Sequence, residues 1–216
     1  MTQVPPGKGG SALPHPLART MMARPRHGRH ALNRAIAAPP ATSLLRTLER
    51  EGVTHVIGLP DNATAPLFTL LAKHPRIALV SVTREGEAFG IAAGLWMGGK
   101  EPVVLVQNTG LLESGDALRG TLTRMGIPLV ILVGWRGFGS LRGRDPRAVT
   151  SAREDLVRAD VDSVALLTLP TLVAWGIPFL TDERDDGSRG VRAAFEGARA
   201  QERPFAFLIT RDLVGA

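Results

Sequence analysis

The sequence predicts an α/β fold in which a doubly wound, mainly parallel six-stranded sheet carries helices on both faces. Short apolar runs alternate with segments of helical periodicity from about residue 42 to the end of the 216-residue chain. The run at 102–107 is almost wholly apolar, as expected of a strand that is buried on both faces of a parallel sheet. Strands that alternate with helices in this way favour parallel pairing through right-handed crossovers.

The first half of the domain is expected to contain three strands. A helix begins after a cap at Thr42 or Ser43 and ends at Gly52. The apolar run at 53–58 is the first strand, and a Leu-Pro-Asp-Asn turn leads from it into a helix at 65–72. A second strand at 77–82 precedes a helix rich in alanine and glycine, and the run at 102–107 is the third strand.

The second half is expected to contain the other three strands. Residues 112–125 have helical periodicity, and the apolar run at 128–134 is the fourth strand. Glycine and arginine indicate a loop at 137–150, which is followed by helices at 152–160 and 171–175. The remaining expected elements are a short fifth strand at 177–180, a polar linker at 181–190, a helix at 191–200 and a sixth strand at 205–210.

The first 41 residues are expected to form a disordered, basic extension to a domain at 42–216. They are rich in proline and glycine, and they offer little apolar surface to offset the entropy of ordering. The first 40 residues hold six basic side chains and no acidic one, whereas the rest of the chain holds 20 of each. The net charge of +6 therefore belongs to the extension, and the neutral remainder does not indicate a nucleic-acid-binding domain.

The composition excludes several classes of site. The chain has no cysteine, which excludes disulfides, thiolate metal sites and cysteine nucleophiles. No apolar run reaches the length needed to span a bilayer, and no apolar segment follows the N-terminal charges as it would in a secretory signal. We therefore expect a cytoplasmic protein that binds neither membranes nor nucleic acid.

The domain is organised around the segment TREGEAFGIAAG, which follows the second predicted strand. This segment places Glu85 in the first turn of a helix and beyond the end of a strand, where such sheets bind ligands. One interpretation is helix stabilisation alone, because acidic side chains favour helix N-termini. The other is a site shared with a partner or cofactor, because Gly90, Ala93 and Gly94 would let another surface pack closely. Glu87 points elsewhere and is expected to be exposed or at an interface.

Four segments together resemble a known family. They are Glu85 with a glycine nine positions later, IGLPDN at 57–62, QNTGL at 107–111 and WRG at 135–137. In this order and spacing they resemble the pyrimidine-binding domain of thiamine-diphosphate enzymes, in particular the sulfopyruvate and phosphonopyruvate decarboxylases. The resemblance covers about residues 42–216. The chain departs from the family at Leu112-Glu113, where the family tends to have glycine-asparagine, and this departure concerns substrate contacts more than the cofactor.

The resemblance implies a thiamine diphosphate cofactor and a catalytic role for Glu85. In the family this carboxyl hydrogen-bonds the pyrimidine nitrogen N1′ and favours the imino tautomer, whose nitrogen takes the proton from thiazolium C2. A carboxyl in a low-dielectric pocket has its pKa raised and can share a proton in this way. The cofactor performs the difficult chemistry, and the protein supplies orientation and electrostatics.

By the same resemblance, residues after the predicted strands approach the ligands. The residues implied in cofactor binding, besides Glu85, are Pro60, Asp61, Asn108, Thr109 and Gly110. The residues implied in substrate binding are Asp61, Asn62, Gln107 and Arg136.

Structural alternatives exist for each of these groups. Asp61 can cap the following helix, and residues 107–110 have the composition of an ordinary turn. A planar guanidinium at Arg136 suits a sulfonate or phosphonate. A solvated basic loop that also contains Arg142, Arg144 and Arg147 is the other interpretation.

The family's diphosphate site is absent from this sequence. In the family, a Gly-Asp-Gly segment with a downstream asparagine holds the diphosphate and Mg²⁺, and no Gly-Asp-Gly occurs here. We therefore assign no metal ligand to this chain. The resemblance implies a beta subunit that carries the diphosphate- and Mg²⁺-binding domain, in a hetero-oligomer with the cofactor at the interface.

The predicted function is that of the pyrimidine-binding alpha subunit of a thiamine-diphosphate-dependent 2-oxoacid decarboxylase. The resemblance implies a carboxy-lyase, active only with its partner subunit, that converts sulfopyruvate or phosphonopyruvate to the aldehyde and CO₂. Two alternatives stay open. One is a carboligase subunit similar to acetolactate synthases, and the other is a non-catalytic regulatory or binding subunit of the same fold.

Overall fold

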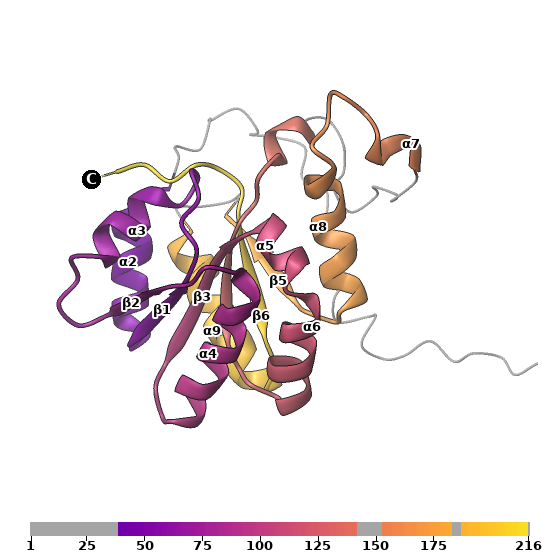
Figure 1. The fold of residues 1–216 in the computed structure, drawn as a ribbon. Helices are drawn as coiled ribbons and strands as arrows, with labels where there is room; N and C mark the ends of the chain where they lie inside the picture. Colours follow the sequence, from indigo (N-terminus) through magenta and orange to yellow (C-terminus); the bar gives the residue numbers. More distant parts are fainter. Residues whose placement is uncertain (1–38, 142–152, 183–186, 216) are drawn as a thin grey trace, which may run out of the picture. The chain divides into compact units, whose positions relative to one another are not determined.

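The computed structural model describes residues 39–141, 153–182 and 187–215 (Figure 1). The chain divides into one unit at Met1–Arg34 and a compact unit at Ala35–Ala216. Residues 1–38 of the extension predicted at 1–41 lie outside the described residues. The three arginines predicted to continue the basic loop after Arg136 also lie outside them.

A six-stranded parallel sheet forms the centre of the compact unit (Figure 1). Its strands are β1 (His55–Gly58), β2 (Ala78–Ser81), β3 (Pro102–Gln107), β4 (Val130–Gly134), β5 (Phe179–Thr181) and β6 (Phe205–Ile209). They lie in the order β2-β1-β3-β4-β6-β5, and every neighbouring pair is parallel. The predicted parallel sheet is confirmed, and each strand begins and ends within two residues of its predicted bounds.

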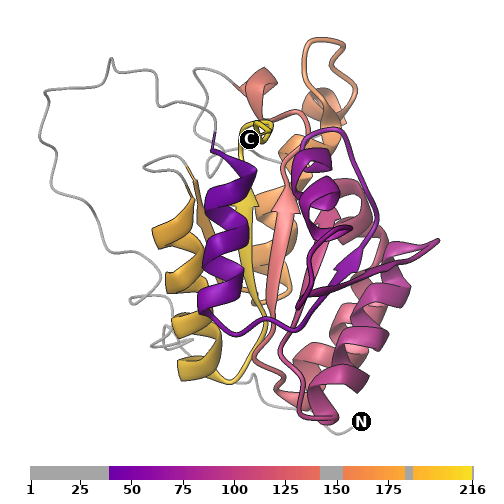
Figure 2. The same ribbon diagram turned by 90° about the vertical axis from the view of Figure 1, so that its left-hand side faces the viewer.

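Helices cover both faces of this sheet, as predicted (Figures 1 and 2). One face carries α2 (Ala41–Arg50), α3 (Ala65–Leu71) and α9 (Ser188–Gln201). The other face carries α4 (Glu85–Met97), α5 (Asn108–Glu113), α6 (Gly115–Leu118), the π-helix η1 (Arg119–Thr123) and α8 (Ser163–Ala174). The 3-10 helix η2 (Phe138–Leu141) and the short helix α7 (Arg153–Leu156) lie between β4 and α8 in the sequence.

The central strands supply side chains to two separate cores. In β3, Val104 and Val106 pack into the core beneath α4 and α8, whereas Val103 and Leu105 pack into the core beneath α2 and α9. The same alternation occurs in β4 and β6. Burial on both faces is the reason why these strands are continuous apolar runs rather than alternating ones.

Gly58 permits the close approach of two central strands. It ends β1 and lies beside Leu105 of β3, and a Cβ at Gly58 would overlap the backbone carbonyl of Leu105. The next strand in sequence, β2, lies on one side of β1, and β3 lies on the other. This reversal of strand order creates a crevice beyond the strand ends, where α/β sheets bind ligands.

The start of the first helix differs from the prediction. Helix α2 begins at Ala41 after Pro40, and neither Thr42 nor Ser43 caps it. Pro40 bridges to Val214, and the Ala41 amide donates a hydrogen bond of 3.0 Å to the Val214 carbonyl. A contact with the distant end of the chain therefore fixes where the helix begins.

The helix predicted at 112–125 is present, but it is interrupted at Ser114 and contains a π-helical part, and helix rather than a turn occupies residues 108–110. Helix α5 begins at Asn108 directly after β3, and α5, α6 and η1 follow one another. The Ser114 hydroxyl donates to the Gly110 carbonyl at 2.6 Å, and the Thr121 hydroxyl donates to that of Ala117 at 2.5 Å. Hydrogen bonds of this kind compete with the regular helix pattern and bend the chain, and the π-helical turn interrupts it further.

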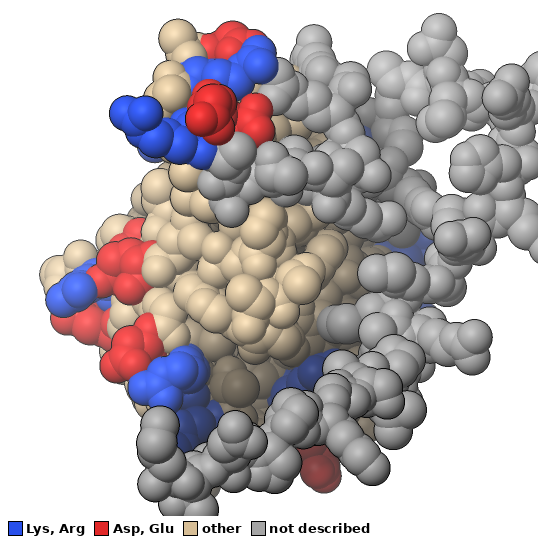
Figure 3. All heavy atoms as spheres, turned by 90° about the vertical axis from the view of Figure 1, so that its right-hand side faces the viewer, with Lys and Arg blue, Asp and Glu red and all other residues tan. Residues whose placement is uncertain are grey.

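Helix α8 is longer than the predicted segment at 171–175. It begins at Ser163, because the Asp162 carboxylate accepts a hydrogen bond of 3.2 Å from the Val164 amide at the helix N-terminus. Residues 163–181 contain no charged side chain, so helical amphipathicity gives no signal there. On the side of the molecule where α8 lies, Figure 3 shows a broad surface without charged residues beside the charged cluster of α7.

The other differences concern connections between elements. The linker predicted at 181–190 includes the end of β5 and the start of α9, and residues 183–186 lie outside the described residues. Within it, Asp182 is buried and accepts a hydrogen bond of 2.9 Å from the Thr210 amide. The loop predicted at 137–150 begins with η2. Of the helices within the described ranges, none is both long enough and apolar enough to cross a membrane.

Candidate functional site

Glu85 begins α4 at the point where the chain leaves the edge strand β2. Its neighbour Arg84 is extended, with φ −144° and ψ 132°, and forms the N-cap of the helix. The Glu85 side chain is half-buried. Its carboxyl makes no hydrogen bond or ion pair with any residue in the described ranges. This leaves both carboxyl oxygens available for a ligand.

Gly110 of α5 forms the surface on which the Glu85 side chain lies. A Cβ at Gly110 would overlap Cγ and Oε1 of Glu85 and would lie 2.5 Å from its Cδ. Gly110 is itself buried within the first turn of α5. Helices α4 and α5 therefore approach closely enough at this point that no larger residue fits beneath the carboxyl.

Glu87 is exposed, as predicted, and has a different role from Glu85. Its carboxylate accepts hydrogen bonds of 3.3 Å from the Thr83 amide and hydroxyl. It therefore stabilises the segment that enters α4. The two carboxylates of the first turn thus have different surroundings, and only that of Glu85 is without a partner among the described residues.

The Asp61 side chain stabilises the start of α3, which was the alternative to a role in ligand binding. Its carboxylate accepts hydrogen bonds from the amides of Ala63 and Thr64, at 2.7 and 3.1 Å, and from the Thr64 hydroxyl at 2.6 Å. On either side of it, Pro60 and Asn62 are exposed. Asp61 therefore holds the turn that leads into α3, whose N-cap is Thr64, and its implied contacts with cofactor and substrate stay predictions.

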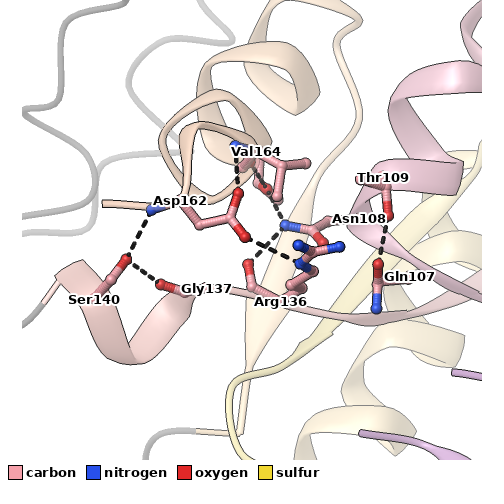
Figure 4. Close-up of polar contacts among 9 residues, drawn as sticks. Gln107, Asn108, Thr109, Arg136, Gly137, Ser140, Asp162 and Val164 are labelled. Atoms are coloured by element: carbon pink, nitrogen blue, oxygen red, sulfur yellow. Dashed lines mark hydrogen bonds and ion pairs between the residues drawn. The ribbon is translucent and has the colours of Figure 1, made fainter. Parts of the chain in front are cut away.

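Asn108 lies inside the protein rather than on the surface of the site. It has 0% exposure, and its side-chain amide donates to the Arg136 carbonyl at 3.1 Å and to the Thr168 hydroxyl at 2.9 Å (Figure 4). This position does not agree with the direct cofactor contact that the resemblance implies. Instead, Asn108 joins the start of α5 to the end of β4 and to α8. The neighbouring Thr109 is exposed and donates a hydrogen bond of 2.5 Å to the side-chain oxygen of Gln107.

A cavity of about 720 Å³ lies beyond the carboxyl ends of the central strands. We call it the strand-end cavity; the lining residues used below are Asn62, Gln107, Arg136 and Arg211. It brings together three of the four predicted substrate-binding residues. Glu85 and the predicted cofactor-binding residues do not line it.

Arginines from the ends of β4 and β6 contribute positive charge to the strand-end cavity. The Arg136 side chain is 58% exposed, and its Nε lies 3.0 Å from Oδ2 of Asp162 (Figure 4). Arg211 donates a hydrogen bond of 2.6 Å to the Asp182 carbonyl. Each guanidinium is therefore oriented by an acidic residue from a different segment of the chain.

The sequence prediction did not include Arg211 or Asp162. Arg211 follows the sixth predicted strand directly, so the rule that places ligands beyond strand ends would have identified it. No comparable signal marked Asp162. This residue caps α8, of which the sequence prediction recognised only the last turn, and its carboxylate orients Arg136.

The two parts of the site are joined through α5. Gln107 lines the strand-end cavity, Asn108 is buried behind it, and Gly110 lies beneath Glu85. Three positions on one short segment thus link the cavity to the free carboxyl. Within the described ranges, no three His, Cys, Asp or Glu side chains gather so as to hold a metal ion.

Comparison with known proteins identifies the family of this chain. The model of the family described as thiamine pyrophosphate enzyme, N-terminal TPP binding domain, matches residues 40–157, more than half of the chain. The half-buried, unpartnered carboxyl of Glu85 fits the pyrimidine of this cofactor, because a ring nitrogen and a carboxyl can share a proton in a hydrogen bond.

The curated relatives are decarboxylases. The phosphonopyruvate decarboxylase of Streptomyces viridochromogenes is 32% identical over 178 residues, which are 81% of this chain and 41% of that protein. Subunit alpha of the sulfopyruvate decarboxylase of Methanothermobacter thermautotrophicus is 35% identical over 86 residues, 40% of this chain and 52% of that subunit. The corresponding subunit of Methanocaldococcus jannaschii is 28% identical over 95 residues, 44% of this chain and 56% of that subunit.

The matched regions span only about half the length of these relatives. The match therefore establishes the family and the domain, and it does not extend to a complete enzyme. The parallel sheet, the free carboxyl that begins α4 and the family match at residues 40–157 agree with one another. The chain belongs to the thiamine pyrophosphate enzymes, as their N-terminal TPP binding domain.

Proposed function

We propose that this chain is the pyrimidine-binding alpha subunit of a thiamine-diphosphate-dependent 2-oxoacid decarboxylase. The observation that carries the proposal is the Glu85 carboxyl, which lies on Gly110 at the start of α4 and has no partner among the described residues. The names of the relatives favour sulfopyruvate or phosphonopyruvate as the substrate and the corresponding aldehyde and CO₂ as the products.

In this proposal Glu85 holds a proton in a hydrogen bond to N1′ of the pyrimidine. When bound, thiamine diphosphate supplies a carbanion that attacks the ketone and an acceptor for the electrons released with CO₂. Glu85 must therefore be positioned before the cofactor arrives, and its contact with Gly110 limits where the carboxyl can lie. A preorganised group of this kind contributes to catalysis without having to reorganise during the reaction.

Arg136 would bind the sulfonate or phosphonate of the substrate in the strand-end cavity. Its ion pair with Asp162 orients the guanidinium and leaves 58% of the side chain exposed. Arg211 adds a second positive charge to the same cavity. Gln107 and Asn62 supply neutral polar groups to the same lining, and in this proposal they too contact the substrate.

A separate beta subunit would supply the diphosphate- and Mg²⁺-binding half of the site. The sequence has no Gly-Asp-Gly segment, and two of the relatives are named as alpha subunits. The outer surface of α4 suits such a partner, because Gly90 and Gly94 have open space above them and the nearby Met97 is 66% exposed. Ala93, which was predicted to belong to this surface, is buried in the core instead.

The decisive experiment compares Glu85→Gln with Glu87→Gln in the enzyme assembled with its beta subunit. We expect Glu85→Gln to lower kcat for sulfopyruvate or phosphonopyruvate by roughly 100-fold or more. Glutamine cannot take up or release the proton, and proton transfer by a positioned acid or base contributes about 10²–10⁴-fold to the rate. Glu87→Gln, in the same helical turn, should keep wild-type turnover. Assembly of each variant with the beta subunit is checked by size-exclusion chromatography.

The outcomes separate the proposed function from its alternatives. Wild-type turnover by Glu85→Gln would overturn the assigned role of this carboxyl. Condensation of the substrate with an added aldehyde or 2-oxoacid, in place of aldehyde release, would identify a carboligase. An assembled wild-type protein that binds no thiamine diphosphate would instead be a non-catalytic subunit.

A further inference from the structure

Glu113 interacts with the residues on both sides of Glu85 and makes no hydrogen bond or ion pair with Glu85 itself. Its Oε1 forms an ion pair with Nε of Arg84, which precedes Glu85. Its Oε2 would lie 3.6 Å from a Cβ at Gly86, which follows Glu85. One carboxylate at the end of α5 thus holds the first turn of α4 from two sides.

The same carboxylate also contacts the surface opposite Glu85. The Ser114 hydroxyl lies 3.3 Å from Oε2 of Glu113 and donates a hydrogen bond of 2.6 Å to the Gly110 carbonyl. Gly110 in turn lies beneath the Glu85 side chain. These contacts connect Arg84 and Gly86, on either side of Glu85 in the sequence, through Glu113 and Ser114 to Gly110 beneath the Glu85 side chain.

The surroundings of Glu113 favour the ionised form of its carboxyl. The hydrogen bond from Arg84 holds the pKa of the Glu113 carboxyl below its ordinary value, against the effect of desolvation, and the Gly86 amide and the Ser114 hydroxyl act in the same direction. The contacts are nevertheless exposed, since the side chains of Arg84 and Glu113 are 73% and 33% accessible. Exposed ion pairs contribute little to global stability, so this arrangement is poorly explained as a device for stabilising the fold.

We propose that Glu113 is a positioning residue that holds the Glu85 carboxyl over Gly110. The inference rests on the proposed catalytic role of Glu85. It gives a role to the departure from the family at Leu112-Glu113, since the residue that replaces the family's asparagine carries the carboxylate that joins α5 to α4. Without Glu113, the first turn of α4 loses its anchor on α5 and the Glu85 side chain can turn away from Gly110.

The first test measures the position of Glu85 in the full chain without cofactor. The readout is the nuclear Overhauser effect between the Glu85 γ-protons and the Gly110 α-protons. We expect Glu113→Ala to weaken this effect severalfold while the thermal unfolding midpoint stays close to that of the wild type. The matched control is Asp116→Asn, which breaks the exposed ion pair between Asp116 of α6 and Arg119 of η1 and should leave the effect unchanged.

A second variant separates positioning from a failure to fold. Glu113→Gln removes the negative charge but keeps a side-chain oxygen that can accept hydrogen bonds from Gly86 and Ser114. We expect an intermediate loss of the Glu85–Gly110 effect. A signal in Glu113→Ala equal to that of the wild type, or an equal loss in Asp116→Asn, would overturn the proposal.

The second test measures cofactor recognition in the assembled enzyme. The probes are thiamine diphosphate and an analogue in which carbon replaces N1′, and the quantity is the ratio of their Kd values. Glu85→Ala should bring this ratio close to one, and Glu113→Ala should lower it by roughly threefold to tenfold, because a hydrogen bond to a misplaced group loses part of its energy. An unchanged ratio in Glu113→Ala would contradict the positioning role.

The two tests also distinguish the inference from the proposed function. If the assembled wild type does not discriminate N1′ from carbon, the proposed function fails. The nuclear Overhauser effect in the isolated chain then still decides whether Glu113 holds Glu85 in place.

Discussion

The side chain of Glu85 occupies the space that a side chain at Gly110 would need. A Cβ at Gly110 would overlap Cγ and Oε1 of Glu85. The two residues belong to different helices: α5 begins directly after β3, and α4 begins four residues after the end of β2. This contact is the basis for reading Glu85 as a preorganised carboxyl rather than as an ordinary acidic residue of a helix N-terminus.

We predict that Gly110→Ala lowers kcat by roughly 100-fold, because the added methyl displaces the Glu85 carboxyl and errors of about 1 Å can cost that much. Alanine favours helix by about 0.5–1 kcal/mol over glycine, so part of the steric cost is offset and the fold should persist. The measurement is kcat in the assembled enzyme, together with the thermal unfolding midpoint. Gly120→Ala, at a position with open space, is the control and should retain activity. Full turnover by Gly110→Ala would show that the contact is not needed.

Arg136→Ala is predicted to raise KM for an anionic 2-oxoacid by roughly 10- to 100-fold, since a hydrogen bond to a charged group contributes about 1.5–3 kcal/mol. The change in kcat should be smaller, because Arg136 is assigned to substrate binding. Arg136→Lys should be intermediate, as lysine keeps the charge but lacks the planar fork. The remote Arg76→Ala, which removes an exposed partner of Glu49, should leave KM unchanged. An unaltered KM in Arg136→Ala would exclude this arginine from substrate binding.

Glu49 is predicted to make stability depend on pH in the acid range. Hydrogen bonds from Arg76 and His74 lower its pKa from the ordinary 4.5, so the folded protein binds fewer protons than the unfolded chain in that range. The stabilisation is therefore present above the unfolded pKa and is lost as the pH falls through the folded pKa. In urea unfolding, wild type should be more stable than Glu49→Gln at pH 7, and the difference should shrink below pH 4.5. A difference that persists unchanged at low pH would exclude this linkage.

Gly58→Ala is predicted to destabilise the fold by about 1–3 kcal/mol through overpacking. The added Cβ would overlap the Leu105 carbonyl, which belongs to the adjacent central strand and cannot move without disturbing the sheet. The expected readout is a lower midpoint in urea and in thermal unfolding. Gly120→Ala again serves as the matched control. Equal stability of the two variants would mean that β1 and β3 separate easily.

The elements that follow from local pattern were predictable. The six strands are short, mainly apolar runs, of which β1, β3, β4 and β6 are largely buried, and their bounds lie within two residues of the predicted ones. Glu85 was found as a candidate because its place after a strand and at the start of a helix is a property of neighbouring residues alone. Arg136 was found for the same reason, at the end of the fourth predicted strand.

The elements that depend on distant contacts were not predictable in the same way. Helix α2 begins at Ala41 because the chain there contacts Val214, and the start of α8 depends on Asp162, which also pairs with Arg136. The polar composition of residues 107–110 resembles a turn. Asn108 nevertheless begins a helix, and its side-chain amide donates hydrogen bonds to the Arg136 carbonyl, after β4, and to the Thr168 hydroxyl of α8.

The sequence by itself determined the parallel α/β sheet, the segments beyond its strand ends and the carboxyl that begins α4. Only the tertiary structure decided which of these residues meet. It placed Glu85 on Gly110, Arg211 in the same cavity as Arg136, and Glu113 against the two sequence neighbours of Glu85. The physical reason is that periodicity and capping act over a few residues, whereas a site depends on the distances between segments that the packing of helices on the sheet brings together.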